Sequence, residues 1–69
     1  MERKPQINMT HEQYTMRRAS IMYWLTSAIS AKCPRTARAR LRDLARLENE
    51  TNGADYAETY RNLLEEYRL

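Results

Sequence analysis

Apolar side chains recur every three or four positions along most of this chain, a spacing that places them on one face of an α-helix. Thr10 and Gln13 precede the first such stretch and have the spacing of a capping box, in which each side chain bonds the backbone amide of the other residue. Cys33-Pro34 ends the stretch, because the residue before a proline is pushed out of the α region. These signals predict a helix over residues 11–32, with core-facing positions at Tyr14, Ile21, Met22, Leu25, Ala28 and Ile29.

Two further helices follow from the same spacing. Pro34 suits the first turn of a helix, where its missing N–H costs nothing, and Asn52-Gly53 is a stop signal because glycine adopts the left-handed cap without penalty. Asp55 and Glu58 have the spacing of a second capping box. The sequence therefore predicts helices over residues 34–51 and 55–68. Their apolar positions are Ala37, Leu41, Leu44 and Ala45, with Leu47 at the border, and then Tyr56, Tyr60, Leu63, Leu64 and Tyr67.

Composition favours an all-α fold. The chain has no Val, no Phe and only three Ile, so most of the residues that favour strands are missing. Its 69 residues make one domain, and the short connections predict a three-helix bundle or an open helical hairpin with an added helix. We expect residues 10–69 to form this single helical domain and residues 1–9 to be a flexible lead-in. Scaffolds this small often gain stability by self-association or by docking on a partner.

The residues needed for catalysis or for metal and cofactor binding are sparse. The only His and the only Cys, His11 and Cys33, lie at opposite ends of the first helix, about 33 Å apart at 1.5 Å per residue. One glycine cannot build a phosphate-binding loop, and one His with one Cys cannot complete a zinc site. The sequence thus predicts no enzyme, no cofactor, no metal and no small-molecule substrate.

The same counts bear on location. A single cysteine favours a reducing compartment, and the longest weakly polar run, residues 21–31, is about half of the ~20 residues that span a bilayer. We therefore expect a cytoplasmic protein that does not insert into a membrane.

Charge is unevenly distributed along the chain. Residues 1–46 carry ten basic and three acidic residues, a balance of +7, whereas residues 47–69 carry two basic and six acidic residues, a balance of −4. Four arginines of the second helix fall within an arc of about 80° and repel one another at i,i+4 spacing. This arginine stripe consists of Arg35, Arg38, Arg42 and Arg46.

The arginine stripe predicts an acidic counterpart outside its own helix. Nucleic-acid phosphates, the acidic third helix of the same or another copy, and a different acidic protein are the candidates. Asp55, Glu58, Glu65 and Glu66 give that third helix an acidic arc, which suits head-to-tail association of copies. A solvated face that keeps the protein in solution is the alternative without a partner.

The aromatic residues form two groups. Tyr23 and Trp24 lie beside the apolar face of the first helix, where a thin core cannot cover both, and we expect Trp24 to mark a protein interface. Tyr56, Tyr60 and Tyr67 are expected at the core with their hydroxyls at its rim, or else along a binding groove.

In length, charge and helical composition the chain resembles the short accessory proteins of bacteriophage early regions and other bacterial mobile elements. The resemblance is one of type, and it implies binding of a host protein or of a nucleic acid. The leading hypothesis is a regulatory interaction protein that binds a protein partner or itself. The alternative is a nucleic-acid-binding regulator that uses the arginine stripe.

Overall fold

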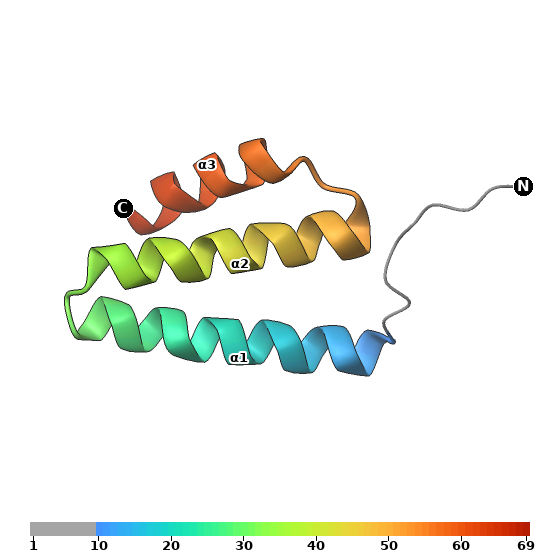
Figure 1. Cartoon of the computed structure of the whole chain (residues 1–69), viewed down its shortest axis with the longest axis horizontal. Helices are drawn as coiled ribbons and strands as arrows, with labels where there is room; N and C mark the ends of the chain where they lie inside the picture. Colours follow the sequence, from blue (N-terminus) through green and yellow to red (C-terminus); the bar gives the residue numbers. More distant parts are fainter. Residues whose placement is uncertain (1–9) are drawn as a thin grey trace, which may run out of the picture.

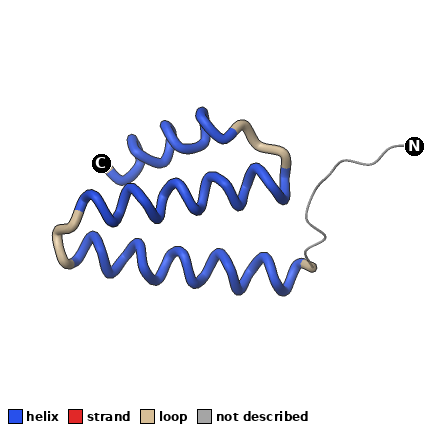
Figure 2. The backbone as a smooth tube through the Cα atoms, in the orientation of Figure 1, coloured by secondary structure: helices blue, strands red, loops and turns tan. Residues whose placement is uncertain are grey.

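Three α-helices make up the structure, a computed structural model that describes residues 10–69. They are α1 (His11–Ser30), α2 (Pro34–Asn52) and α3 (Tyr56–Tyr67), joined by two short connections (Figures 1 and 2). The predicted all-α class is confirmed, and residues 10–69 contain no strand. The flexible lead-in predicted for residues 1–9 lies outside the described residues.

Helix α1 begins as predicted and ends two residues early. The Thr10 hydroxyl accepts from the Gln13 amide and the Gln13 side chain accepts from the Thr10 amide, both at 3.1 Å, so the capping box is complete. At the other end Lys32 adopts the left-handed conformation, φ 58°. The Cys33 amide then donates to the Ala28 carbonyl at 2.9 Å, which closes a Schellman turn and stops the helix before the proline.

Helices α2 and α3 have boundaries within one residue of those predicted. Pro34 occupies the first turn of α2, and Gly53 ends the helix at φ 74°. The Asn49 amide group donates to the Ala54 carbonyl at 2.8 Å and fastens the connection to α3. Asp55 caps α3 through the Ala57 amide, one residue before the amide that a capping box would use, so the second capping box is not formed as predicted.

Helix α2 lies between the other two helices. It contacts α1 along one side and α3 along the other, and within residues 10–69 no backbone contact joins α1 to α3 (Figure 1). Of the two predicted arrangements, the structure therefore has the open one, a helical hairpin of α1 and α2 with α3 added on the far side of α2. The result is a single layer of helices rather than a closed bundle.

The core lies along α2 and is small. Leu25 and Leu41 are the two large side chains that are completely buried among the described residues. Five of the seven buried residues belong to α2, two belong to α1, and α3 contributes half-buried side chains that pack against them. The buried residues are Leu25, Ala28, Ala37, Leu41, Leu44, Ala45 and Leu47.

Two predicted core positions need correction. Leu47, expected at the border, is 97% buried, because α1 and α3 cover two sides of α2 and widen its buried arc. Ile29, expected in the core, is 41% exposed, because α3 does not reach across to the end of α1.

Candidate interaction surfaces

Among the described residues, the most exposed large apolar side chains lie on α1. Met16, Tyr23 and Trp24 are 66%, 64% and 55% exposed. The rings of Tyr23 and Trp24 touch edge to face, with centroids 5.1 Å apart and an angle of 81° between their planes. The structure therefore leaves uncovered both of the residues that the sequence marked as candidates for an interface.

A continuous row of exposed residues accompanies these side chains. Its members recur at spacings of three and four, and in an α-helix they point away from Leu25 and the core. We call this row the outer α1 face. It consists of Glu12, Met16, Ala19, Tyr23, Ser27 and Ser30, with Trp24 beside it.

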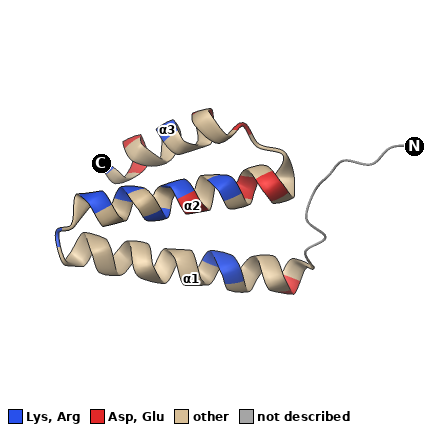
Figure 3. Ribbon diagram, viewed as in Figure 1, with Lys and Arg blue, Asp and Glu red and all other residues tan. Residues whose placement is uncertain are grey.

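The outer α1 face is almost free of charge. Residues 19–31 contain no Asp, Glu, Lys, Arg or His, although 30% of the whole chain is charged. Figure 3 shows this stretch of α1 as an unbroken uncharged ribbon beside the heavily charged α2. A helix face that serves only to keep a protein in solution normally carries charged side chains. The outer α1 face lacks such side chains over residues 19–31.

The three tyrosines of α3 lie elsewhere. Tyr60 and Tyr67 are half-buried and pack against the core, and Tyr56 stacks on Tyr60 with ring centroids 6.2 Å apart and planes 8° from parallel. They form the inner side of α3, as the core interpretation expected. Because α1 and α3 lie on opposite sides of α2, these tyrosines and the Tyr23–Trp24 pair do not form one surface.

The arginine stripe remains accessible. Arg35, Arg42 and Arg46 are exposed and Arg38 is half-buried. Among residues 10–69 the one ion pair joins Arg40 to Asp43 at 3.2 Å, so no described acid of α3 neutralises the stripe. The surface thus keeps its positive charge for an external anion or for solvent.

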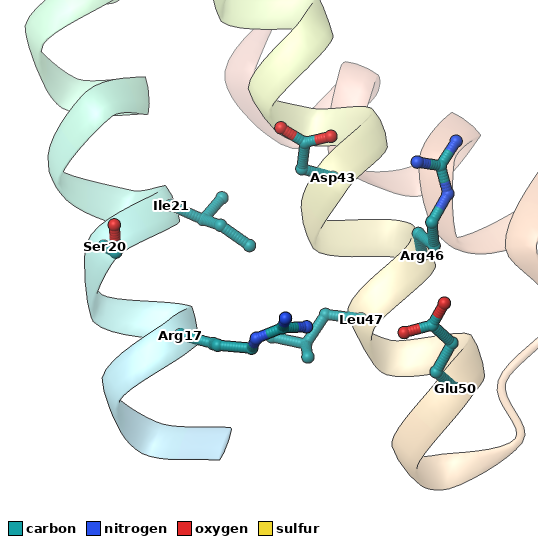
Figure 4. A pocket seen from close by; sticks show the side chains of 7 residues that line it. All are labelled: Arg17, Ser20, Ile21, Asp43, Arg46, Leu47 and Glu50. Atoms are coloured by element: carbon teal, nitrogen blue, oxygen red, sulfur yellow. The ribbon is translucent and has the colours of Figure 1, made fainter. Parts of the chain in front are cut away.

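A shallow cleft of about 340 Å³ lies between α1 and α2 (Figure 4). Ile21 and Leu47 supply its apolar part, and two arginines and two acids surround them. The charges balance, so the cleft favours neither an anion nor a cation. Sequence reasoning missed it because it depends on how the antiparallel helices align. Its lining residues are Arg17, Ser20, Ile21, Asp43, Arg46, Leu47 and Glu50.

A hydrogen-bond network that the sequence did not predict joins the start of α1 to the end of α2. The Tyr14 hydroxyl donates a hydrogen bond to Glu48, and the other carboxylate oxygen of Glu48 accepts from the Asn52 side chain at 2.6 Å. The bond to the carboxylate raises the pKa of Tyr14 above its ordinary value, and partial burial raises it further. This arrangement links the start of α1 to the end of α2.

His11 and Cys33, the two residues considered for catalysis or metal binding, lie apart in the structure. His11 opens α1, whereas Cys33 follows its end and is exposed, with its thiol 3.8 Å from the Ala31 carbonyl oxygen. Within the described part of the chain no group of three or more His, Cys, Asp or Glu side chains is placed to hold a metal ion. None of the helices described there is long and apolar enough to cross a membrane.

Comparisons with protein families, with curated proteins and with solved structures find nothing that matches this chain. The class defined by the structure is a small, open, three-helix all-α protein.

Proposed function

We propose that this protein is a small, non-enzymatic interaction protein with a regulatory role, and that it binds a protein partner or itself through the outer α1 face and Trp24. The observation that carries the proposal is the exposed Tyr23–Trp24 pair on a helix with no charged residue from 19 to 31. A cytoplasmic location and a likeness in type to phage accessory proteins belong to the same proposal.

The exposed aromatic area is large enough to contribute to binding. Tyrosine and tryptophan bury about 150–250 Å² each in an interface, and more than half of the surface of each residue is exposed on α1. Covering what remains exposed of both removes roughly 240 Å² from water, a gross gain of about 6 kcal/mol before the cost of association. Such aromatic side chains commonly dominate the energetics of an interface.

A second candidate function is nucleic-acid binding, favoured by a different observation. Arg35, Arg42 and Arg46 are exposed, and no acid among residues 10–69 pairs with them. Successive i,i+4 arginines repeat every ~6 Å along the helix axis, so they can contact neighbouring phosphates of one strand. The acidic α3 lies beside this surface and lowers its net positive field, which is why this function ranks second.

Two variants of opposite design separate the candidates. The first, Tyr23→Ser with Trp24→Ser, removes the aromatic pair, and the second, Arg42→Ala with Arg46→Ala, removes half of the arginine stripe. If the leading proposal holds, a protein captured from a nuclease-treated lysate is lost with the first variant and kept with the second. Retention by the aromatic-deleted variant contradicts the proposal.

The nucleic-acid candidate is tested by titrating duplex DNA and single-stranded RNA while NMR shifts are followed. Shifts confined to α2, with a salt slope of roughly −0.9 in log K per phosphate contact, support it. The nucleic-acid candidate is contradicted if the affinity does not change with salt concentration, or if it is unchanged in the variant Arg42→Ala with Arg46→Ala.

A further inference from the structure

We infer that Asn52 is a site of spontaneous covalent modification, at which its side-chain amide is lost, and that its hydrogen bond to Glu48 delays the reaction in the folded protein. The inference goes beyond the proposed function, because the reaction requires neither a partner nor a catalytic group. It rests on the Asn52–Gly53 pair at the end of α2, on the exposure of both residues, and on the hydrogen bonds that their amides make.

The reaction needs only the chain itself and water. The backbone nitrogen of Gly53 attacks the side-chain carbonyl carbon of Asn52. The amide nitrogen of Asn52 then leaves as ammonia, with the proton of the attacking N–H, and a cyclic imide remains. Water opens this ring at either of its carbonyl carbons and leaves aspartate or isoaspartate in place of the asparagine. No atom is oxidised or reduced.

Gly53 is well suited to be the attacking residue. It has no Cβ beside its backbone nitrogen, and the position where a Cβ would stand has no other atom within 4 Å. Asn52 and Gly53 are both exposed to water. The Gly53 amide closes the last turn of α2 by donating to the Asn49 carbonyl at 3.1 Å. Because helix ends open most easily, this nitrogen is released without unfolding of the whole domain.

Two other asparagines in the helices lack these properties. Asn49 precedes Glu50 within α2, and Asn62 precedes Leu63 within α3. In each case the next backbone nitrogen belongs to a continuing helix, and the residue that carries it has a side chain. The Asn49 amide group is also held by the Ala54 carbonyl at 2.8 Å. These two residues therefore serve as internal references for Asn52.

A hydrogen bond holds the Asn52 side chain away from Gly53. Its amide nitrogen donates to Glu48, one turn earlier in α2, at 2.6 Å, and the other carboxylate oxygen of Glu48 accepts from Tyr14 of α1. Side chains of a helix lean toward its N-terminus, whereas the Gly53 nitrogen lies on the C-terminal side of Asn52. The bond to Glu48 must therefore break before the ring closes, so the folded protein reacts more slowly than the unfolded chain.

Both products weaken the link between α1 and α2. Loss of the amide removes the donor to Glu48, and the new carboxylate stands one helical turn from that of Glu48, where like charges repel. The helix dipole also opposes a negative charge at the C-terminus of α2. Isoaspartate in addition lengthens the backbone that leads to α3. The modification thus loosens the network that delays it, and the hairpin loses stability as the protein ages.

Incubation of the full chain in mildly alkaline buffer at physiological temperature tests the site. Peptide mass spectrometry and labelling by an isoaspartyl methyltransferase follow the conversion. We expect conversion at Asn52, none at Asn49 or Asn62 over the same period, and faster conversion at Asn52 when the same chain is held in concentrated urea. Asn52→Gln should abolish the reaction at this position, because its longer side chain closes such a ring poorly.

Glu48→Ala tests the delay. Because it frees the Asn52 side chain, it should speed the conversion roughly five-fold, the factor that corresponds to one hydrogen bond. Loss of overall stability is controlled with Ala28→Gly, which weakens the opposite end of the hairpin and keeps the bond from Asn52 to Glu48. This control should convert at the rate of the unaltered protein.

Asn52→Asp reproduces one product and tests the consequence. In urea unfolding it should lower the equilibrium constant for folding roughly five-fold. The effect should be smaller in a Glu48→Gln background, because the second negative charge is then absent. Circular dichroism of each variant at low urea verifies that the helices form.

Four results would overturn the inference. They are no conversion at Asn52 in the folded protein, equal rates in the folded and the urea-unfolded chain, equal acceleration by Glu48→Ala and Ala28→Gly, and an Asn52→Asp variant as stable as the unaltered protein. The first removes the site, the second and third remove the delay by Glu48, and the fourth removes the loss of stability. Binding through the outer α1 face is measured separately, so none of these results decides the proposed function.

Discussion

At the scale of single residues, Glu48 connects the two ends of the hairpin. It accepts from Tyr14 of α1 and, with its other oxygen, from Asn52 of its own helix. The carboxylate bonds to the protonated phenol and repels the phenolate, so it raises the pKa of Tyr14. A bond between residues 34 positions apart fixes where α1 starts relative to where α2 ends.

Removal of this bond should lower stability at neutral pH and change its alkaline dependence. Tyr14→Phe should cost about 1 kcal/mol at pH 7, the usual value for a partly exposed hydrogen bond. Because the folded pKa lies above the ordinary 10.0, the stabilisation is complete below pH 10 and is lost as pH rises through the folded pKa. Urea unfolding of both proteins at pH 7 and above pH 11 measures this. A difference that stays constant across that range would contradict the assignment.

At the scale of elements, each of the three helices is followed by a residue in the left-handed conformation, and after α3 this residue is Arg68 at φ 57°. Lys32 follows α1 at φ 58°, and Gly53 follows α2 at φ 74°. Only glycine adopts this region without a steric penalty from Cβ. The turn after α1 therefore carries strain, which its two Schellman hydrogen bonds and Pro34 hold in place.

Substitutions at these two positions should have opposite signs. Gly53→Ala should destabilise by about 1 kcal/mol through backbone strain alone, because a Cβ there meets no atom within 4 Å. Lys32→Gly should raise the free energy of unfolding by up to about 1 kcal/mol. This gain is the backbone strain that glycine relieves minus the extra conformational entropy that glycine loses on folding. Thermal unfolding should show shifts of roughly 4–8 °C per kcal/mol. Gly53→Asn, which tolerates this conformation better, serves as control and should lose less than alanine.

At the scale of the whole molecule, α2 holds the fold together. Helices α1 and α3 each pack on α2, and within the described residues their backbones do not approach one another. Leu41 of α2 is completely buried in the cluster that also contains Leu25 of α1 and is lined by side chains of α3. Cooperative folding of the layer therefore depends on this cluster.

Truncation of Leu41 should loosen both outer helices at once. Leu41→Ala should cost about 2–5 kcal/mol, a large part of the stability of a domain this small. Leu64→Ala, at a half-buried position of α3, should cost less. Urea unfolding measures both, and hydrogen exchange shows where protection is lost. Loss confined to α3 after Leu41→Ala would contradict the central role of α2.

Local signals in the sequence determined the helices. Thr10 with Gln13, Pro34 and Gly53 act through bonds or torsions within a few residues, so their effects are visible in the chain itself. The sequence also predicted that a core this thin would leave at least one of Tyr23 and Trp24 uncovered, with Trp24 as the expected one, and the structure exposes both. The end of α1 was misplaced by two residues because nothing in the sequence marked Lys32 as left-handed.

Only the tertiary structure decided that α1 and α3 lie on opposite sides of α2, with no backbone contact between them in the described part of the chain. Amphipathic spacing predicts which residues are buried, yet a closed bundle and an open layer of helices can bury those residues almost equally well. The exposure of Ile29 and the burial of Leu47 follow from that choice, whereas the Tyr14–Glu48 bond follows from the alignment of α1 with α2. Each depends on residues distant in sequence, and their contact is set by the packing of whole helices, which no local pattern encodes.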